Sequence, residues 1–134
     1  AAVDMAVDAG AEYIISPNVN LKVIERTKQR EKISIPGAFS PTEIVSAYEA
    51  GADIIKVFPA STLGPGYFKA LKSALSHIPL FAVGGVDEKN IVAFLEAGAS
   101  GAGVGGNLVS KSAIREKDYH RLTETAKEYF RSIK

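Results

Sequence analysis

Cysteine is absent from the 134-residue sequence, and histidine occurs only as His77 and His120. Without a thiol the chain can form no disulfide, perform no thiolate catalysis and build no cysteine zinc site. Two histidines are also too few for a histidine-rich metal centre. The sequence therefore excludes thiol-based sites and predicts no metal site built on histidine.

Long apolar runs and clustered basic residues are missing as well. No apolar run approaches the ~18 residues that suggest a membrane span. The 16 Lys and Arg nearly balance the 15 Asp and Glu, and no basic stretch alternates with aromatic residues. Nucleic-acid binding needs a clustered positive footprint. We therefore predict no nucleic-acid partner and no membrane partner. The overall composition is that of a soluble globular protein.

The length allows one domain with a core but not two ordinary domains. We accordingly treat residues 1–134 as a single domain. The first residue is Ala rather than Met, and residues 1–9 look like the middle of a helix. We expect that the front of the protein is missing from this chain, so the lack of a targeting segment carries no information.

A three-residue repeat divides the sequence into similar segments. Ala-Gly-Ala occurs at positions 9–11, 50–52 and 97–99, each time closing a helix-like run and opening an apolar one. A further strand and helix fit between successive copies, so one period corresponds to two βα units. Glycine at the end of each helix suits the left-handed position after the C-cap, where a Cβ would be costly.

Apolar and helix-like segments alternate along the chain. Continuous apolar runs are typical of parallel strands covered on both sides, and they predict strands at Tyr13–Ser16, Ile33–Gly37, Ile54–Phe58, Leu80–Val83 and Gly101–Gly105. The predicted helices are Leu21–Arg30, Pro41–Ala50, Gly66–Ser76, Asp87–Ala97 and Asp118–Ile133. Strict alternation predicts an α/β fold with a parallel sheet and right-handed crossovers.

Two architectures fit this alternation. One is an open, doubly wound sheet that is complete with five strands. The other is a (β/α)8 TIM barrel, whose complete form needs at least ~200 residues. The helix-like first residues favour the barrel, with this chain supplying strands four to eight and three βα units missing at its front. Both architectures place their active sites after the carboxyl ends of the strands.

Lys56 interrupts the apolar run from Ile54 to Phe58. A buried ammonium is costly, so this lysine either reaches solvent at the strand end or is held there for a reason. A neutral amine can attack a ketone and form an iminium, which acts as an electron sink in aldol chemistry. Burial lowers the pKa of a lysine and so favours the neutral amine. Lys56 is either a Schiff-base lysine or a strand-end lysine paired with a carboxylate.

Two glycine pairs follow consecutive predicted strands, at positions 84–85 and 105–106. Without a Cβ the backbone N–H groups are accessible, and such nests bind phosphate. Barrels often hold a phosphate between the loops after strands seven and eight, which is where these pairs fall in a barrel. Together the pairs favour phosphate binding; the alternative is that they only form tight turns.

Other polar candidates are better explained as structural. Ser40 and Glu43 have the spacing of a capping box, so Glu43 is predicted to cap a helix rather than act as a general base. His77 precedes a strand, at the end of a barrel opposite the chemistry, and His120 lies in the last helix. The Gly-Pro-Gly segment 64–66 is predicted to be a loop.

Taken in order, these segments resemble the 2-keto-3-deoxy-6-phosphogluconate (KDPG) aldolases, which often also act on 4-hydroxy-2-oxoglutarate. The resemblance covers about residues 1–110 and rests on Ile-Lys-Val-Phe-Pro at 55–59, Gly-Pro at 64–65, Ala-Val-Gly-Gly-Val at 82–86 and Gly-Val-Gly-Gly-Asn at 103–107. It implies a (β/α)8 barrel of the class I aldolase type, usually a cytoplasmic homotrimer, that needs no cofactor and no metal.

The resemblance also assigns residues to roles. Lys56 occupies the position of the Schiff-base lysine, and Pro17 and Phe58 fall where the family lines its pyruvate pocket. The positions that match the phosphate-binding segments are Gly84, Gly85, Gly105, Gly106 and Asn107. Asn107 stands where many members have a serine on the phosphate.

Two departures from the family bear on substrate and mechanism. The family commonly has Pro-Thr where this sequence has Ala82 and Val83, so a hydroxyl facing the substrate is lost. The family's general acid/base glutamate lies on strand two with a phosphate-binding arginine nearby, and neither is in this chain. Glu43 does not match that glutamate.

The resemblance predicts a class I aldolase that cleaves KDPG or a close relative to pyruvate and glyceraldehyde 3-phosphate. Its predicted partner is a small keto-acid phosphate. One alternative is a 4-hydroxy-2-oxoglutarate aldolase without phosphate recognition. The other is a non-catalytic barrel that binds a phosphate ligand, with Lys56 as an ionic contact.

Overall fold

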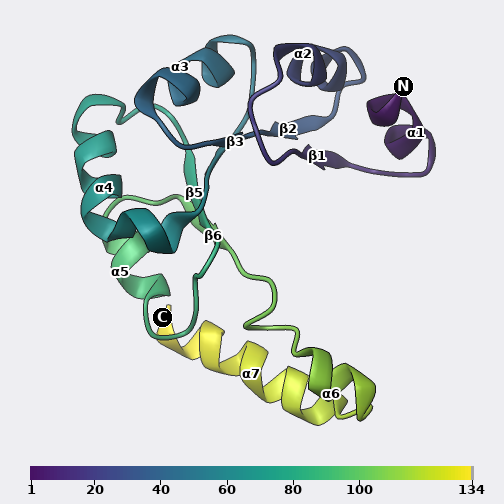
Figure 1. The fold of residues 1–134 in the computed structure, drawn as a ribbon, viewed down its shortest axis with the longest axis vertical. Helices are drawn as coiled ribbons and strands as arrows, with labels where there is room; N and C mark the ends of the chain where they lie inside the picture. The colour runs from purple at the N-terminus through teal and green to yellow at the C-terminus, as the bar shows by residue number, and fades with distance from the viewer. Residues whose placement is uncertain (134) are drawn as a thin grey trace.

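The computed structural model describes residues 1–133 as a curved α/β unit (Figure 1). The helices are α1 (Ala2–Asp8), α2 (Leu21–Gln29), α3 (Pro41–Glu49), α4 (Ala60–Ala74), α5 (Ile91–Glu96), α6 (Lys111–Arg115) and α7 (Tyr119–Ser132). The strands are β1 (Tyr13–Ile15), β2 (Ile33–Ile35), β3 (Gly37–Ala38), β4 (Ile55–Val57), β5 (Leu80–Val83) and β6 (Gly101–Gly103).

All strands pair in parallel, in the order in which they occur along the chain. One ladder joins β1 to β2, and a second has the order β3-β4-β5-β6. The predicted strand Ile33–Gly37 is divided between the ladders at Pro36, which has no N–H to donate. The Pro36 carbonyl still accepts from the Lys56 N–H at 2.9 Å, so the chain passes directly from one ladder to the next.

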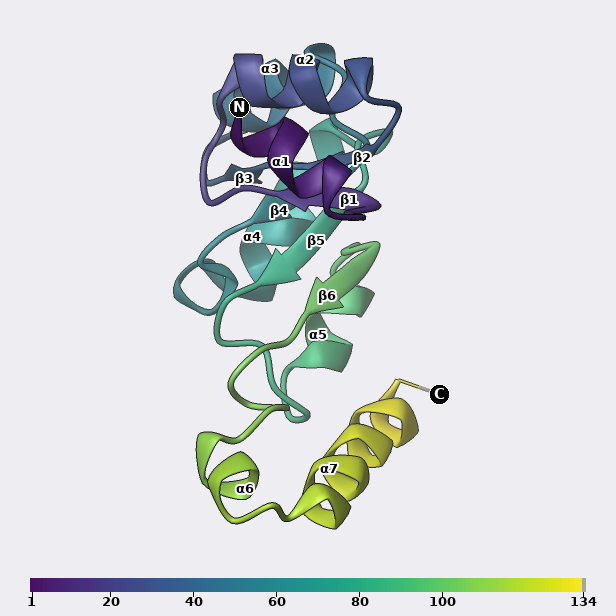
Figure 2. The same cartoon turned by 90° about the vertical axis from the view of Figure 1, so that its right-hand side faces the viewer.

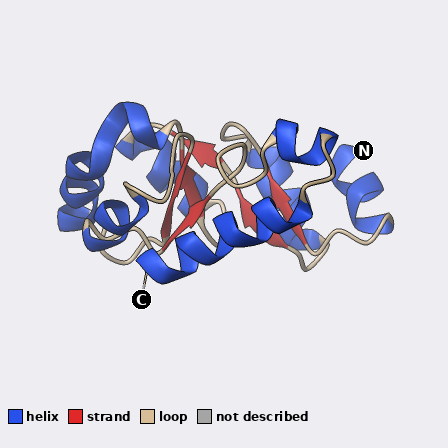
Figure 3. Cartoon of the chain, turned by 90° about the horizontal axis from the view of Figure 1, so that it is seen from below, coloured by secondary structure: helices blue, strands red, loops and turns tan. Residues whose placement is uncertain are grey.

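The helices from α2 to α5 lie on the convex side of the strands, and the concave side is left open (Figures 1 and 2). In the view from below, the helix that ends at the C-terminus crosses in front of the strands (Figure 3). A doubly wound sheet has helices on both faces and a strand order that reverses. The sequential order and the single covered face therefore exclude that architecture for residues 1–133.

The hydrophobic core lies between the convex face of the sheet and these helices. Phe68 of α4 and Phe94 of α5 are fully buried and meet edge to face, with their ring centroids 5.3 Å apart. The sheet contributes the other side of this core through Ile55, Val57, Leu80 and Ala82. These side chains alternate with residues that point to the concave face, as the pleat of a strand requires.

The Ala-Gly-Ala repeat marks three equivalent helix ends. Gly10, Gly51 and Gly98 have φ of 100°, 97° and 100°, in the left-handed region that favours glycine. The alanine after each glycine donates its N–H back to a helix carbonyl, at 2.9 to 3.1 Å. This geometry is that of a Schellman motif, and it confirms the predicted role of the repeat.

Helix starts are where the predictions and the structure differ most. Helix α4 begins six residues before the predicted Gly66, because residues 64–66 lie inside it around a kink at Gly64 (φ 74°) rather than in a loop. Helix α5 begins at Ile91, four residues after the predicted Asp87. The short helix α6 was not predicted at all. In contrast, Ser40 and Glu43 form the predicted capping box of α3.

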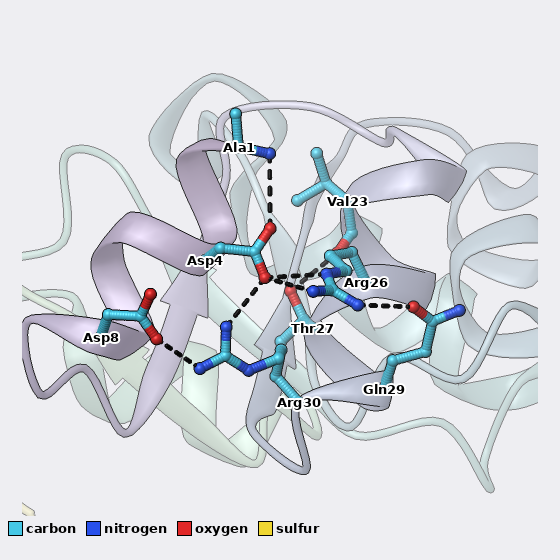
Figure 4. Close-up of polar contacts among 8 residues, drawn as sticks. All are labelled: Ala1, Asp4, Asp8, Val23, Arg26, Thr27, Gln29 and Arg30. Atoms are coloured by element: carbon cyan, nitrogen blue, oxygen red, sulfur yellow. Dashed lines mark hydrogen bonds and ion pairs between the residues drawn. The ribbon is translucent and has the colours of Figure 1, made fainter.

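An ion-pair network fastens α1 to α2 (Figure 4). The Asp4 carboxylate accepts from the Arg26 Nη2 at 2.6 Å and from the Arg30 Nη1 at 2.8 Å, and Arg30 also pairs with Asp8. These arginine hydrogen bonds hold the pKa of Asp4 well below its usual range. The network secures the N-terminal helix against its neighbour.

Helix α7 is amphipathic, as the sequence predicts, and packs against α5 through Tyr129, which is 6% exposed. Asp118 caps its first turn by accepting from the Arg121 N–H at 3.0 Å. Throughout residues 1–133, no helix has the length and apolar character needed to cross a membrane.

Candidate active site

Lys56 is the central residue of β4 and faces the open, concave side of the sheet. Its neighbours Ile55 and Val57 are fully buried in the core, whereas Lys56 is only partly buried. Its partners in the adjacent strands are Gly37 and Phe81. Because side chains alternate along a strand, the Lys56 amine enters the concave side and not the core.

An apolar hollow of about 380 Å³ receives this amine. Its walls are inward-facing residues of five strands, and Lys56 is the only charged residue among them. The hollow is lined by Tyr13, Ile15, Ile35, Lys56, Phe81, Val83, Ala102 and Gly103. We name it the lysine hollow.

The surroundings of Lys56 make its ammonium form less favourable than it is in water. Burial lowers the pKa of Lys56 from its ordinary value, and no carboxylate within residues 1–133 pairs with it. The structure therefore provides no partner for the alternative of a strand-end ion pair. The Lys56 Nζ lies 5.3 Å from the centroid of the Phe58 ring, so the predicted pocket residue Phe58 stands beside the amine.

Because Gly37 has no side chain, the loop after β1 can lie close to Lys56. A Cβ on Gly37 would overlap the Pro17 carbonyl and stand 3.0 Å from the Lys56 Cε. The structure thus places the predicted residue Pro17 next to the lysine, through its backbone. Reasoning from the sequence did not single out Gly37, although a glycine after Pro36 in an apolar strand is a visible signal of close backbone approach.

A second hollow, of about 270 Å³, adjoins the ends of β5 and β6. We name it the glycine hollow. Its lining brings together all five residues predicted for phosphate, from two loops that are far apart in sequence. It consists of Val83, Gly84, Gly85, Val86, Gly103, Gly105, Gly106 and Asn107.

The glycines of the first loop are required by conformation and by space. Gly84 and Gly85 have φ of 93° and 72°. A Cβ on Gly84 would stand 2.9 Å from the Phe58 ring, and one on Gly85 would overlap the Ser61 side chain. The loop therefore packs directly on the segment that follows β4, which carries Phe58.

In the second loop, the N–H groups of Gly105, Gly106 and Asn107 donate to no acceptor among residues 1–133. The Gly105 carbonyl accepts from the N–H groups of Leu108 and Val109, both at 2.9 Å. Asn107 donates its side-chain Nδ2 to the Val86 carbonyl at 3.0 Å and so links the two loops. No Lys or Arg of residues 1–133 lines this hollow, so the groups it could offer to an anion are backbone N–H dipoles.

The two hollows are neighbours, because Val83 and Gly103 line both of them. The amine and the glycine loops therefore lie on adjoining parts of the same side of the sheet. Val83 occupies the junction, and its side chain offers no hydrogen bond there.

The remaining candidates lie outside these hollows. Glu43 accepts from the N–H groups of Ser40 and Phe39, at 2.7 and 2.8 Å, and these contacts lower its pKa. His77 stacks edge to face on Tyr48, with centroids 5.5 Å apart. Over residues 1–133, no group of His, Cys, Asp and Glu side chains is arranged to hold a metal ion.

Comparison with known proteins supplies the family. The family model described as KDPG and KHG aldolase matches residues 1–125. The chain therefore belongs to the KDPG/KHG aldolase family. Its relatives include the 2-dehydro-3-deoxy-6-phosphogalactonate aldolase of Escherichia coli, which is 37% identical over 98% of this chain and 64% of its own length. A probable enzyme of the same name from Rhizobium meliloti is 38% identical over 81% of this chain and 51% of its own length.

Solved structures agree in fold. A structure described as native KDPGal is 37% identical to this chain and superimposes on it with a TM-score of 0.87. The match covers 98% of this chain and 65% of that one. The KDPG aldolase of Legionella pneumophila, captured with pyruvate as a covalent carbinolamine, is 27% identical with a TM-score of 0.79, over 89% of this chain and 58% of that one. The chain thus spans between about half and two thirds of the length of these relatives.

Proposed function

We propose that the chain carries the Schiff-base half of a class I aldolase acting on a 2-dehydro-3-deoxy-6-phospho sugar acid. The observation that supports this most directly is the partly buried Lys56 amine, without a carboxylate partner among residues 1–133, in a hollow that adjoins a glycine-lined hollow. The apolar walls suit the carbon chain of a keto acid, and the glycine loops suit its phosphate. The sequential parallel strands with helices on one side form part of the wall of a (β/α)8 barrel in this proposal.

The chemistry follows from the amine. Lys56 Nζ adds to the C2 ketone, and loss of water gives an iminium. The C3–C4 bond then breaks, with its electron pair flowing into the iminium to form an enamine, while the C4 hydroxyl loses its proton and becomes the aldehyde. Protonation of the enamine at C3 and hydrolysis release pyruvate and free the amine.

No carboxylate lines either hollow within residues 1–133. The proton transfers therefore need a group beyond those described, such as the glutamate that the family resemblance places on an earlier strand. Pro17 and Phe58 would border the pyruvate moiety on either side of the amine. In this proposal the backbone N–H groups of the two glycine loops hold the phosphate.

Reduction with borohydride in the presence of pyruvate tests the proposal. A covalent adduct on Lys56, located by peptide mass analysis, is the expected result. Lys56→Met should remove the adduct, and Lys69→Met, which alters an exposed lysine of α4, should leave it intact. An adduct spread over surface lysines, or none, would refute the Schiff base and leave the phosphate-binding alternative.

The phosphogalactonate acid is the second substrate to test beside the phosphogluconate acid. The relatives named for phosphogalactonate are 37% and 38% identical to this chain, whereas one named for phosphogluconate, from Treponema pallidum, is 29% identical. The two acids differ in configuration at C4, the carbon released as the aldehyde. Val83, which lines both hollows, stands where the family resemblance places a threonine, so an apolar side chain takes the place of a hydroxyl. This change is a reason for a different preference between the two configurations at C4 of the substrate.

Comparing kcat/KM for the two acids and for unphosphorylated 4-hydroxy-2-oxoglutarate separates the three substrates. A preference for the unphosphorylated acid would contradict the role given to the glycine hollow. The homotrimer and the cytoplasmic location also stay predictions of the family resemblance.

A further inference from the structure

Three consecutive carbonyl groups of the first glycine loop are each held by a donor from another segment. The Gly84 carbonyl accepts from the Ser61 N–H at 3.0 Å. The Gly85 carbonyl accepts from the Asn90 Nδ2 at 2.9 Å, and the Val86 carbonyl accepts from the Asn107 Nδ2 at 3.0 Å. Every carbonyl between Gly84 and Val86 is therefore fixed in direction.

Fixing a carbonyl also fixes the N–H of the next residue. A trans peptide group is planar, so its N–H points opposite to its C=O. The N–H groups of Gly85 and Val86 consequently point away from Ser61 and Asn90. Neither N–H donates to any acceptor among residues 1–133. Since both residues line the glycine hollow, these two N–H groups are its available donors on this side.

Asn90 holds this loop from two sides. Its Nδ2 donates to the Gly85 carbonyl, and its Oδ1 accepts from the Asp87 N–H at 2.9 Å. The Asp87 Oδ1 in turn accepts from the Asn90 N–H at 3.1 Å. Asn90 stands at the N-cap of α5, yet its side chain makes no capping bond to that helix. Asp87 and Asn90 thus form a reciprocal pair of the capping-box kind ahead of α5, and the Asn90 Nδ2 is left over to hold the Gly85 carbonyl.

We infer that Asn90 is a positioning residue for the glycine hollow: by joining the Gly85 carbonyl to the Asp87 N–H, it sets the direction of the N–H groups that receive the phosphate. The inference rests on the proposed phosphate site. Asn90 does not itself line the hollow, so it acts through the loop and not by contact with the ligand. A side chain with one donor and one acceptor is needed, and asparagine supplies both at the required reach.

Two substitutions at Asn90 separate these contacts. Asn90→Asp keeps an acceptor for the Asp87 N–H and removes the donor to the Gly85 carbonyl, whereas Asn90→Ala removes both. The matched control is Asn20→Ala, which removes a true helix cap that accepts from the N–H groups of Lys22 and Val23, far from the hollow in sequence.

The readout is the affinity of the whole chain for inorganic phosphate, followed by the amide NMR shifts of the glycine loops. Both Asn90 variants should bind phosphate about tenfold more weakly, the effect of losing one well-aligned hydrogen bond to an ion. Asn20→Ala should keep its affinity. Borohydride trapping of pyruvate on Lys56 should be unchanged in all three proteins, because the lysine hollow does not depend on Asn90.

Each other result has a defined meaning. Undiminished phosphate affinity in Asn90→Asp would overturn the positioning role while leaving the proposed aldolase intact. Loss of pyruvate trapping together with phosphate affinity would also overturn it, because Asn90 would then support the sheet as a whole. If the unchanged chain bound no phosphate but still trapped pyruvate, the phosphate part of the proposed function would fail and this inference with it.

Discussion

Gly37→Ala places a methyl group where the Pro17 carbonyl and the Lys56 side chain now meet. The new Cβ would overlap the Pro17 oxygen and stand 3.0 Å from the Lys56 Cε. Because Gly37 is held in the ladder opposite Lys56, the strand cannot retreat without breaking its pairing with β4. The loop at Pro17 or the lysine must move instead.

The cost of Gly37→Ala is that of adding one methyl group to a site with no room for it. Overpacking by one methyl group costs about 1–3 kcal/mol. For a chain of this size, each kcal/mol lowers the melting temperature by about 3–5 °C. We expect Gly37→Ala to melt about 3–15 °C lower, and to trap pyruvate much more slowly at a temperature where it is still folded. Circular dichroism melts and borohydride trapping measure the two effects.

Gly66→Ala is the matched control. Gly66 lies in α4 with no atom within 4 Å of its Cβ position, so alanine should be neutral or should stabilise the helix by up to about 1 kcal/mol. Its trapping rate should equal that of the unchanged chain. Wild-type trapping and melting in Gly37→Ala would refute the view that this glycine holds Pro17 against the lysine.

Three further predictions concern charged groups. The rate at which pyruvate is trapped on Lys56 should rise with pH through a pKa below the ordinary lysine value, and a rate independent of pH would contradict this. The free energy of unfolding should also rise between the lowered pKa and the ordinary one, because the unfolded chain binds more protons there. Ser40→Ala and Glu43→Gln should each lower the free energy of unfolding by about 1 kcal/mol without affecting trapping, and loss of trapping in Glu43→Gln would show that Glu43 is more than a cap. The Glu43 contribution is present at neutral pH and is lost as the pH falls through its lowered pKa. Asp4→Asn should lower the melting temperature at neutral pH and lose this effect in strong acid, where the parent aspartate is also protonated; a deficit that persists there would exclude the pairing with Arg26 as its cause.

The features predicted well from sequence are those fixed by local chemistry. Apolar runs located all the strands, and Gly51 in its Ala-Gly-Ala segment marked a helix end because only glycine suits the left-handed position there. The Ser40–Glu43 capping box has the same local origin. Lys56 stood out because a charge in an apolar run has few explanations, and the glycine loops did meet in one hollow.

The features missed depend on contacts between distant segments. Asn90 stands at the N-cap of α5, but its Nδ2 bonds the Gly85 carbonyl in the loop before the helix, and nothing local distinguishes it from an ordinary cap. Gly64 permits α4 to continue through a kink, which the Gly-Pro-Gly pattern conceals. The phosphate contact predicted for Asn107 stays a prediction, but the link from its Nδ2 to the Val86 carbonyl was not foreseen, because it requires knowing where Val86 lies.

The Ala-Gly-Ala turns enter their strands at the amino ends, while the glycine hollow lies at the carboxyl ends of β5 and β6. The turns that fix where strands begin are thereby separated, by the length of a strand, from the loops proposed to hold the phosphate. Random mutagenesis should divide along this axis, with changes at one end altering yield and heat resistance, and changes at the other altering substrate choice. For a protein engineer, the loops after β5 and β6 should be exchanged together and not singly, because Asn107 joins one to the other, while the glycine turns stay unchanged.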